Sequence, residues 1–136
     1  MTYSKFILFV ITTIAVFSSC NFNHTYMPEL NGKQEAIIDS IDTKYRFENI
    51  NLQGRKTSGT GGTHTSLTVD FINGKNIPSG DDKITVLAKK LAIQIRQTLK
   101  NPKEFESYII RFDDKVVNGN TTTTNYVGHE FKASEL

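Results

Sequence analysis

Few side chains in this chain of 136 residues combine a reactive type with a spacing that supports catalysis or metal binding. The three histidines, His24, His64 and His129, are separated by 40 and 65 positions, and no pair has the spacing of metal ligands. The serines and carboxylates form no nucleophile motif. Two acidic pairs, at 81–82 and 113–114, have structural explanations at a helix start and before a turn. We therefore expect no enzymatic activity, no metal site and no cofactor.

A glycine-rich segment, SGTGGTHT at residues 58–65, has the composition of a phosphate-binding loop. A phosphate cradle runs from a strand into the N-terminus of a helix and, in the P-loop, carries a lysine. Here the segments on both sides have the pattern of strands, and that lysine is missing. The segment is therefore interpreted as the tip of a hairpin. A loop that closes over a partner is the alternative.

Cys20 is the only cysteine of the chain, so no disulfide can form within one copy. It follows Lys5, an apolar run over residues 6–17, and two small residues, Ser18 and Ser19. Positive, apolar and then small residues are the order of a secretory signal. The apolar run has 12 residues, whereas a membrane-spanning helix needs about 20. A signal segment is therefore favoured over a transmembrane anchor.

The motif Phe17-Ser18-Ser19-Cys20 resembles the lipobox of bacterial lipoprotein precursors, with Phe17 where that family usually has leucine. The resemblance covers residues 1–20 only. It implies a signal peptide over residues 1–19, cleavage before Cys20, and a diacylglyceryl group on the Cys20 thiol, often with further acylation of the new amino group. It also implies attachment to a membrane of the cell envelope, with the domain in the periplasm or at the cell surface. In some bacteria Asn21, rather than Asp, after the cysteine favours the outer membrane. The alternative is a buried Cys20 behind a signal that is cut elsewhere.

The segment from Cys20 to residue 33 is polar, contains Pro28 and Gly32, and shows no periodicity. We interpret it as the lipidated cysteine followed by a flexible tether, which spans on the order of 20 Å as a coil. Residues 34–136 are then a single domain.

Alternating and helical patterns predict an α+β domain, a four-stranded antiparallel sheet of order ββαββ. One long helix packs on one face of the sheet, and a short N-terminal helix covers an edge or an end. Asn118-Gly119 predicts the last hairpin turn, which places Val117 opposite Asn120 and Ile110 opposite Val127. The expected elements are helices at 34–45 and 81–100 and strands at 46–56, 65–72, 107–117 and 120–131.

The second face of the long helix is a candidate partner surface, formed by Val86, Lys89, Lys90, Ile93, Arg96 and Lys100. A protein or the anionic headgroups near the anchor would fit such a surface. The alternatives are that Ile37, Ile38 and Ile41 of the short helix cover Val86 and Ile93, or that the lysines simply solvate the helix. A second candidate is the threonine run at 121–124, which suits an exposed strand and could also bind polysaccharide.

The formal net charge is +2, from 16 basic and 14 acidic residues without a long run of either sign, which argues against nucleic acid as a main partner. The sequence thus predicts a lipid-anchored, non-catalytic envelope lipoprotein that binds a protein partner, as an assembly component, an inhibitor or an immunity-type protein. The alternative is a binding module for envelope polysaccharide or another small ligand.

Overall fold

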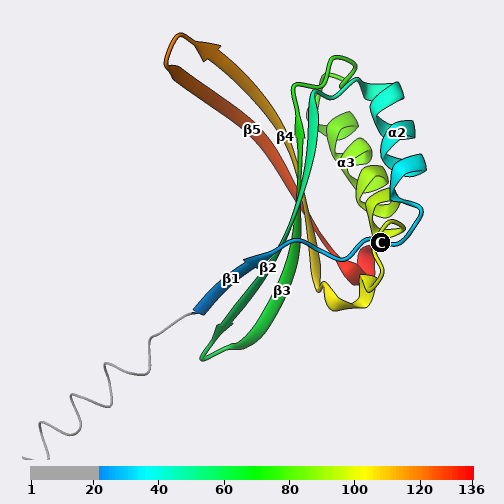
Figure 1. The fold of residues 1–136 in the computed structure, drawn as a ribbon, viewed down its shortest axis with the longest axis vertical. Helices are drawn as coiled ribbons and strands as arrows, with labels where there is room; N and C mark the ends of the chain where they lie inside the picture. Colours follow the sequence, from blue (N-terminus) through cyan, green and yellow to red (C-terminus); the bar gives the residue numbers. More distant parts are fainter. Residues whose placement is uncertain (1–21) are drawn as a thin grey trace, which may run out of the picture.

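The computed structural model describes residues 22–136, which form one sheet with two helices against it (Figure 1). Residues 1–21, with the predicted signal peptide and Cys20, lie outside the described part. The elements are, in chain order, β1 (Phe22–Tyr26), α2 (Gln34–Tyr45), β2 (Asn49–Gly59), β3 (Gly62–Ile72), α3 (Asp81–Arg96), η1 (Pro102–Glu104), β4 (Ser107–Asn118), β5 (Thr121–Lys132) and η2 (Ala133–Glu135).

The sheet has five strands in the order β1-β2-β3-β4-β5, and the pair β3–β4 is parallel while the other pairs are antiparallel. The α+β class was predicted correctly, but the four-stranded antiparallel sheet was wrong. Helix α3 carries the chain back along the sheet, so β4 starts at the same end as β3. Such a crossover makes the two strands parallel.

The fifth strand comes from the segment that was interpreted as a flexible tether. Strand β1 pairs with Gly54–Ser58 of β2, and Leu30 forms an isolated bridge with Leu99. The main-chain N–H of Asn31 donates to the carbonyl oxygen of Thr98 at 2.7 Å. The sequence held a signal for β1, because aromatic rings at 22, 24 and 26 alternate with small polar side chains.

Both hairpin turns differ from the expected ones. The β4–β5 turn has Gly119 and Asn120 at its centre, so that Asn118 faces Thr121 and Ile110 faces His129. Gly119 has φ +61°, and two-residue loops of the Gly-X type place glycine first for this reason. The register is displaced by two residues, which leaves each side chain on its predicted face. Strands β2 and β3 continue through most of the glycine-rich segment to a turn at 60–61.

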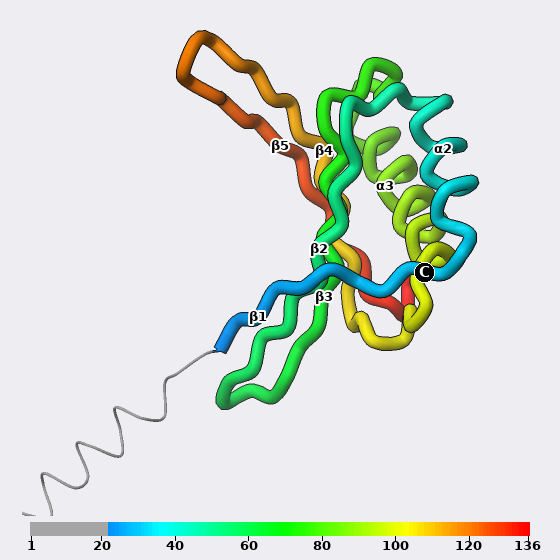
Figure 2. The backbone as a smooth tube through the Cα atoms, viewed as in Figure 1, coloured from blue at the N-terminus to red at the C-terminus, as the bar shows by residue number. Residues whose placement is uncertain are grey.

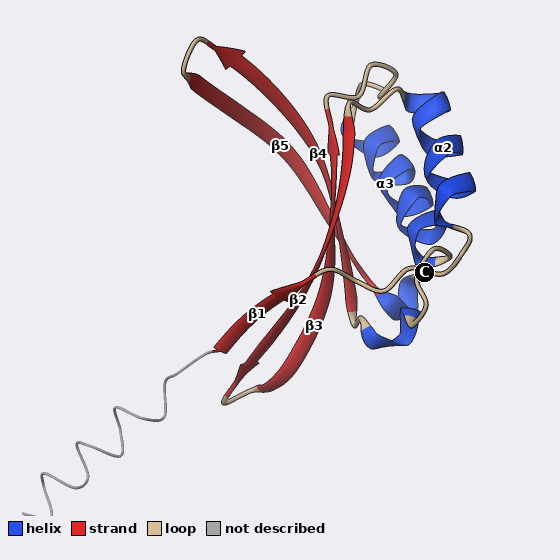
Figure 3. Ribbon diagram, in the orientation of Figure 1, coloured by secondary structure: helices blue, strands red, loops and turns tan. Residues whose placement is uncertain are grey.

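The core lies between the sheet and the two helices, all on one side (Figure 3). Helix α3 contributes most of the helical side because its apolar residues recur at spacings of three and four. The fully buried residues include Ile41 on α2 and Tyr108 and Phe71 on the sheet. The opposite face of the sheet has no helix over it in the part of the chain that is described.

Candidate functional site

The outer face of α3 brings together four of the six residues predicted as a partner surface. Val86 is 72% exposed and Ile93 is 37% exposed, and both lie beside the exposed side chains of Lys89 and Lys90. With Gln94 these residues line a shallow hollow of about 430 Å³. We call this set, Val86, Lys89, Lys90, Ile93 and Gln94, the α3 patch.

Helix α2 does not cover the α3 patch in the way that the alternative interpretation expected. Ile41 is 1% exposed and packs into the core, while Ile37 and Ile38 are partly buried. Val86 stays open to solvent, so α2 packs beside this face of α3 and not over it. Val86 and Ile93 together therefore leave an apolar surface open to solvent between the lysines.

The other two predicted residues belong to different contacts. The guanidinium of Arg96 donates to the carbonyl oxygen of Ala133 at 3.1 Å, which ties α3 to the C-terminal segment. Lys100 lies beyond the end of α3, and its ammonium group is 2.8 Å from the carboxylate of Glu29. This contact lowers the pKa of Glu29 and raises the pKa of Lys100. Both partners are more than 60% exposed, so the pair adds little stability.

The far part of the β4–β5 hairpin is a second candidate surface, of which sequence reasoning singled out only the threonine run at 121–124. Pairing between β3 and β4 ends at Asp113, so Asp114–Asn118 and Thr121–Asn125 continue as a two-stranded ribbon, here called the arm (Figure 2). Val116 and Val117 on the arm are 45% and 67% exposed. Tyr126 and Val127 at its base are 64% and 46% exposed. Residues 116–128 contain no charged side chain, and this was the available sequence signal.

Strand β5 is also an outer strand of the sheet, with 12 residues and one side free of any described strand. Proteins usually protect such an edge with charges, proline or a bulge. The pairing of β5 with β4 runs from Thr121 to Lys132 without a bulge, and this strand contains no proline. Its main chain is therefore open to a strand from another molecule.

The threonine run at 121–124 lies on the arm and does not form one flat hydroxyl face. Thr122 and Thr124 face Val117 and Lys115, whereas Thr121 and Thr123 face Asn118 and Val116. Successive side chains of a strand point to opposite faces, so the four hydroxyl groups divide between two surfaces. This arrangement weakens the interpretation of the run as a polysaccharide platform.

A charged cluster lies at the base of the arm on the open face of the sheet. The Arg111 guanidinium is 3.4 Å from the carboxylates of both Asp70 and Asp113, and it lies over the ring of Tyr126 at 4.5 Å. Asp113 is buried, and the side chains of Asp70 and Arg111 are 25% and 32% exposed. Burial raises the pKa of Asp70, an effect that Arg111 opposes and Asp113 adds to. The cluster joins β3, β4 and β5 at the base of the arm.

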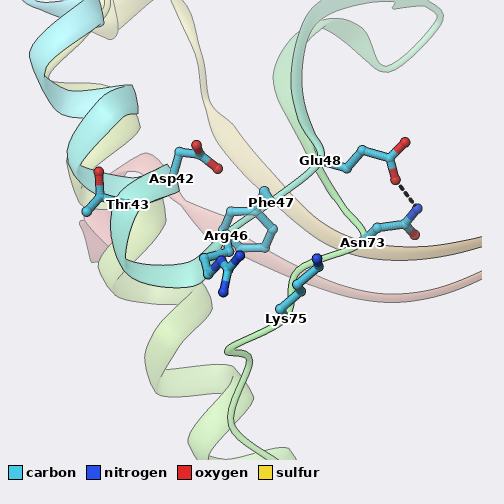
Figure 4. Close-up of a pocket in the computed structure, with 7 residues that line it drawn as sticks. All are labelled: Asp42, Thr43, Arg46, Phe47, Glu48, Asn73 and Lys75. Atoms are coloured by element: carbon cyan, nitrogen blue, oxygen red, sulfur yellow. Dashed lines mark hydrogen bonds between the residues drawn. The ribbon is translucent and has the colours of Figure 1, made fainter.

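A polar pocket of about 540 Å³ opens where α2 ends (Figure 4). Arg46 and Asn73 have φ values of +53° and +52° there, and each has a structural reason. Arg46 is the left-handed C-cap of α2, with its N–H donating to the carbonyl of Asp42, and asparagine tolerates this region. The Asn73 amide donates to Glu48. The lining residues are Asp42, Thr43, Arg46, Phe47, Glu48, Asn73 and Lys75, a mixed set of charges without a paired nucleophile and base.

The three histidines lie on three different strands, and most of the glycine-rich segment belongs to β2 and β3. His24 stacks on Tyr26, His64 contacts Glu106 at 3.0 Å, and His129 is 3.5 Å from the Thr85 hydroxyl. Within residues 22–136 no group of three or more His, Cys, Asp or Glu side chains is placed to hold a metal ion. A hollow of about 540 Å³ on the open face is lined by hydroxyls and by His64, Glu106, Glu130 and Lys132.

No protein-family model matches this chain, and no curated protein or solved structure is significantly similar to it. Among the described helices, none has the length and apolar character needed to cross a membrane.

Proposed function

We propose that this protein is a bacterial lipoprotein, held to an envelope membrane by lipid on Cys20, whose domain binds a protein partner and is not catalytic. The support for the anchor is the order of Lys5, the apolar run and the motif that ends at Cys20. The thiol is the nucleophile that thioether formation requires. Two or more acyl chains give stable attachment, since one chain holds a protein only marginally.

The single observation that carries the binding role is the exposure of Val86 between lysines on an otherwise well-packed helix. The α3 patch has an apolar centre, Val86 and Ile93, and a basic rim, Lys89 and Lys90. Interfaces are commonly built from an apolar centre and a polar rim. A fitting partner presents an apolar side chain surrounded by carboxylates, because the rim then adds electrostatic steering.

The binding role is tested by cross-linking the tagged, lipidated protein in its own membranes and identifying the cross-linked residues by mass spectrometry. We expect one abundant protein joined through Lys89 or Lys90. Val86→Glu together with Ile93→Glu should abolish its capture. Ala36→Glu together with Thr43→Glu, two exposed positions seven residues apart on α2, is the matched surface control. The binding role is wrong if the α3 variant still captures the same protein, or if the α2 control loses it equally.

The anchor has a separate test in the Cys20→Ala variant. We expect this change to block cleavage before residue 20 and to remove the acyl mass from the protein. A wild-type protein that is cut elsewhere and carries no lipid would contradict the proposed anchor and leave the α3 patch untouched.

The second candidate function is binding of a small polyhydroxylated ligand in the hydroxyl-lined hollow of the open face. Thr57, Thr65, Ser66 and Ser107 line this hollow together with the His64–Glu106 pair. Titration calorimetry with envelope oligosaccharides tests it. His64→Ala should then weaken the binding that the wild type shows, and no heat with the wild type excludes this candidate.

A further inference from the structure

Strand β1 leaves very little free chain between the sheet and the proposed anchor. Cys20 precedes Phe22 by two positions, and Phe22 is the first residue of β1. Two residues span at most about 7 Å, even when fully extended. A lipid on Cys20 therefore holds one end of the sheet at the bilayer, in contrast to the long tether that the sequence led us to expect.

The β2–β3 turn lies at this same end of the sheet (Figure 2). Phe22 pairs with Ser58, and the turn at 60–61 is two residues further along β2. Because β1 and β2 are antiparallel, the N-terminal end of β1 and the turn lie at the same end of the sheet. The turn is roughly 8 Å along the strands from Phe22, and Cys20 is at most about 7 Å from Phe22 by chain length. We call β1 with residues 54–65 the β1 end.

The surface of the β1 end suits the headgroup region of a membrane. Within these segments the charged residues are Arg55 and Lys56, one on each face of the sheet, and they contain no carboxylate. Long basic side chains reach headgroups while their stems lie along the protein. Phe22, which pairs with Ser58 nearer the turn, is 67% exposed. The nearby carboxylates, Glu104 and Glu106, are engaged by Tyr26 and His64.

We propose that the β1 end lies against the surface of the bilayer that holds the anchor, with Arg55 and Lys56 in contact with anionic lipid headgroups. The arm then points into the aqueous space, since about 50 Å of strand length separates the two turns. This orientation rests on the proposed lipidation of Cys20.

The test uses the lipidated full-length product in vesicles of phosphatidylethanolamine and phosphatidylglycerol that contain a nickel-chelating lipid. Thioether formation consumes the Cys20 thiol, so a new cysteine is the sole free thiol and takes a spin label. Thr60→Cys places the label at the β1 end, and Thr122→Cys places it beside the turn of the arm. Both are exposed threonines at hairpin ends, which makes them a matched pair.

We expect headgroup nickel to relax the label at residue 60 several-fold more than the label at residue 122. Arg55→Glu with Lys56→Glu should reduce that difference. Equal relaxation at both positions, in protein whose intact mass includes the lipid, would overturn the orientation while leaving the anchor in place. Protein without the acyl mass would instead overturn the anchor, and the orientation with it. An unchanged difference in the charge-reversed variant would contradict the headgroup contacts.

Discussion

The β1 end and the arm are two places where strands extend away from the rest of the fold, and they are built in different ways (Figure 1). A run of 13 residues without a full charge passes through each of them: residues 57–69 begin in the β1 end, and residues 116–128 cover most of the arm and its base. The β1 end has three strands, and Arg55 and Lys56 stand at its base. The arm has two strands, with Val116 and Val117 exposed on it and Tyr126 and Val127 exposed at its base.

The two ends therefore differ in how much they depend on contact with another molecule. A two-stranded hairpin is marginally stable in water, whereas a third strand adds a second ladder of hydrogen bonds. The β1 end has that third strand and, under the proposed lipidation of Cys20, a membrane beside it. The arm has neither, and its edge strand and apolar side chains are open. The arm is therefore the end that gains most from a protein partner.

The base of the arm should be the more sensitive of the two ends, because it depends on Arg111. We expect Arg111→Met to lower the free energy of unfolding by about 3 kcal/mol, since it leaves the carboxylates of Asp113 and Asp70 without their cation. Urea denaturation measures the change. Asp70→Asn is the control and should cost little, because burial already disfavours the charge of Asp70. An equal loss in both variants would show that Arg111 stabilises the fold through its ion pair with Asp70 and not through its contact with Asp113.

The base of the β1 end depends on the fit between Gly54 and Tyr26. A Cβ atom at Gly54 would lie 2.8 Å from the Tyr26 ring, which stacks on Phe105 at 6.3 Å. We expect Gly54→Ala to cost about 2 kcal/mol and to speed amide exchange in β1. Gly61→Ala, in the turn of the same end, meets no atom within 4 Å and should be close to neutral. If Gly54→Ala lowers the free energy of unfolding no more than Gly61→Ala does, the Tyr26 ring moves aside and the close fit does not matter.

The tip of the arm should respond locally and leave the rest of the fold unchanged. Gly119 has φ +61°, so Gly119→Ala is expected to cost about 1 kcal/mol at the turn. Because the arm lies beyond the last pair with β3, its opening need not unfold the core. Amide exchange at residues 121–125 should quicken about fivefold while Tm stays nearly constant. A clear drop in Tm would show that the arm and the core unfold together.

Local patterns in the sequence predicted most elements, whereas the pairing of distant segments could not be read from them. The apolar stripe of α3 and the alternation in β3 were sufficient for those two elements. Nothing local distinguishes a parallel from an antiparallel neighbour for β4. The choice follows from where α3 returns the chain. Strand β1 was missed because its five residues contain two small polar side chains and precede Pro28, features that also describe a linker.

The candidate surfaces, too, could be predicted only as far as local spacing in the sequence defines them. Helical spacing alone brought Val86, Lys89, Lys90 and Ile93 together, and the structure groups them. Lys100 was assigned to that face because the helix was expected to reach it, but α3 ends at Arg96. The arm could not be predicted, since its exposure depends on where β3 stops beside β4, a tertiary property that no window of sequence contains.

The smallest predicted effect concerns pH and separates the two ends once more. Burial, followed by the hydrogen bond and the charge of Glu104, raises the pKa of Tyr26 from 10.0 to about 12. The folded protein therefore keeps this proton where the unfolded chain loses it. Its contribution to stability is full below pH 10 and is lost as the pH rises through about 12. We expect Tyr26→Phe to reduce this loss in part, measured as Tm over the same pH range. The rest of the loss includes Tyr108, because burial also raises the pKa of that residue.

Tyr126→Phe, at the base of the arm, is the matched control and should retain the loss. An equal flattening by both variants would mean that alkaline sensitivity is not a property of the β1 end.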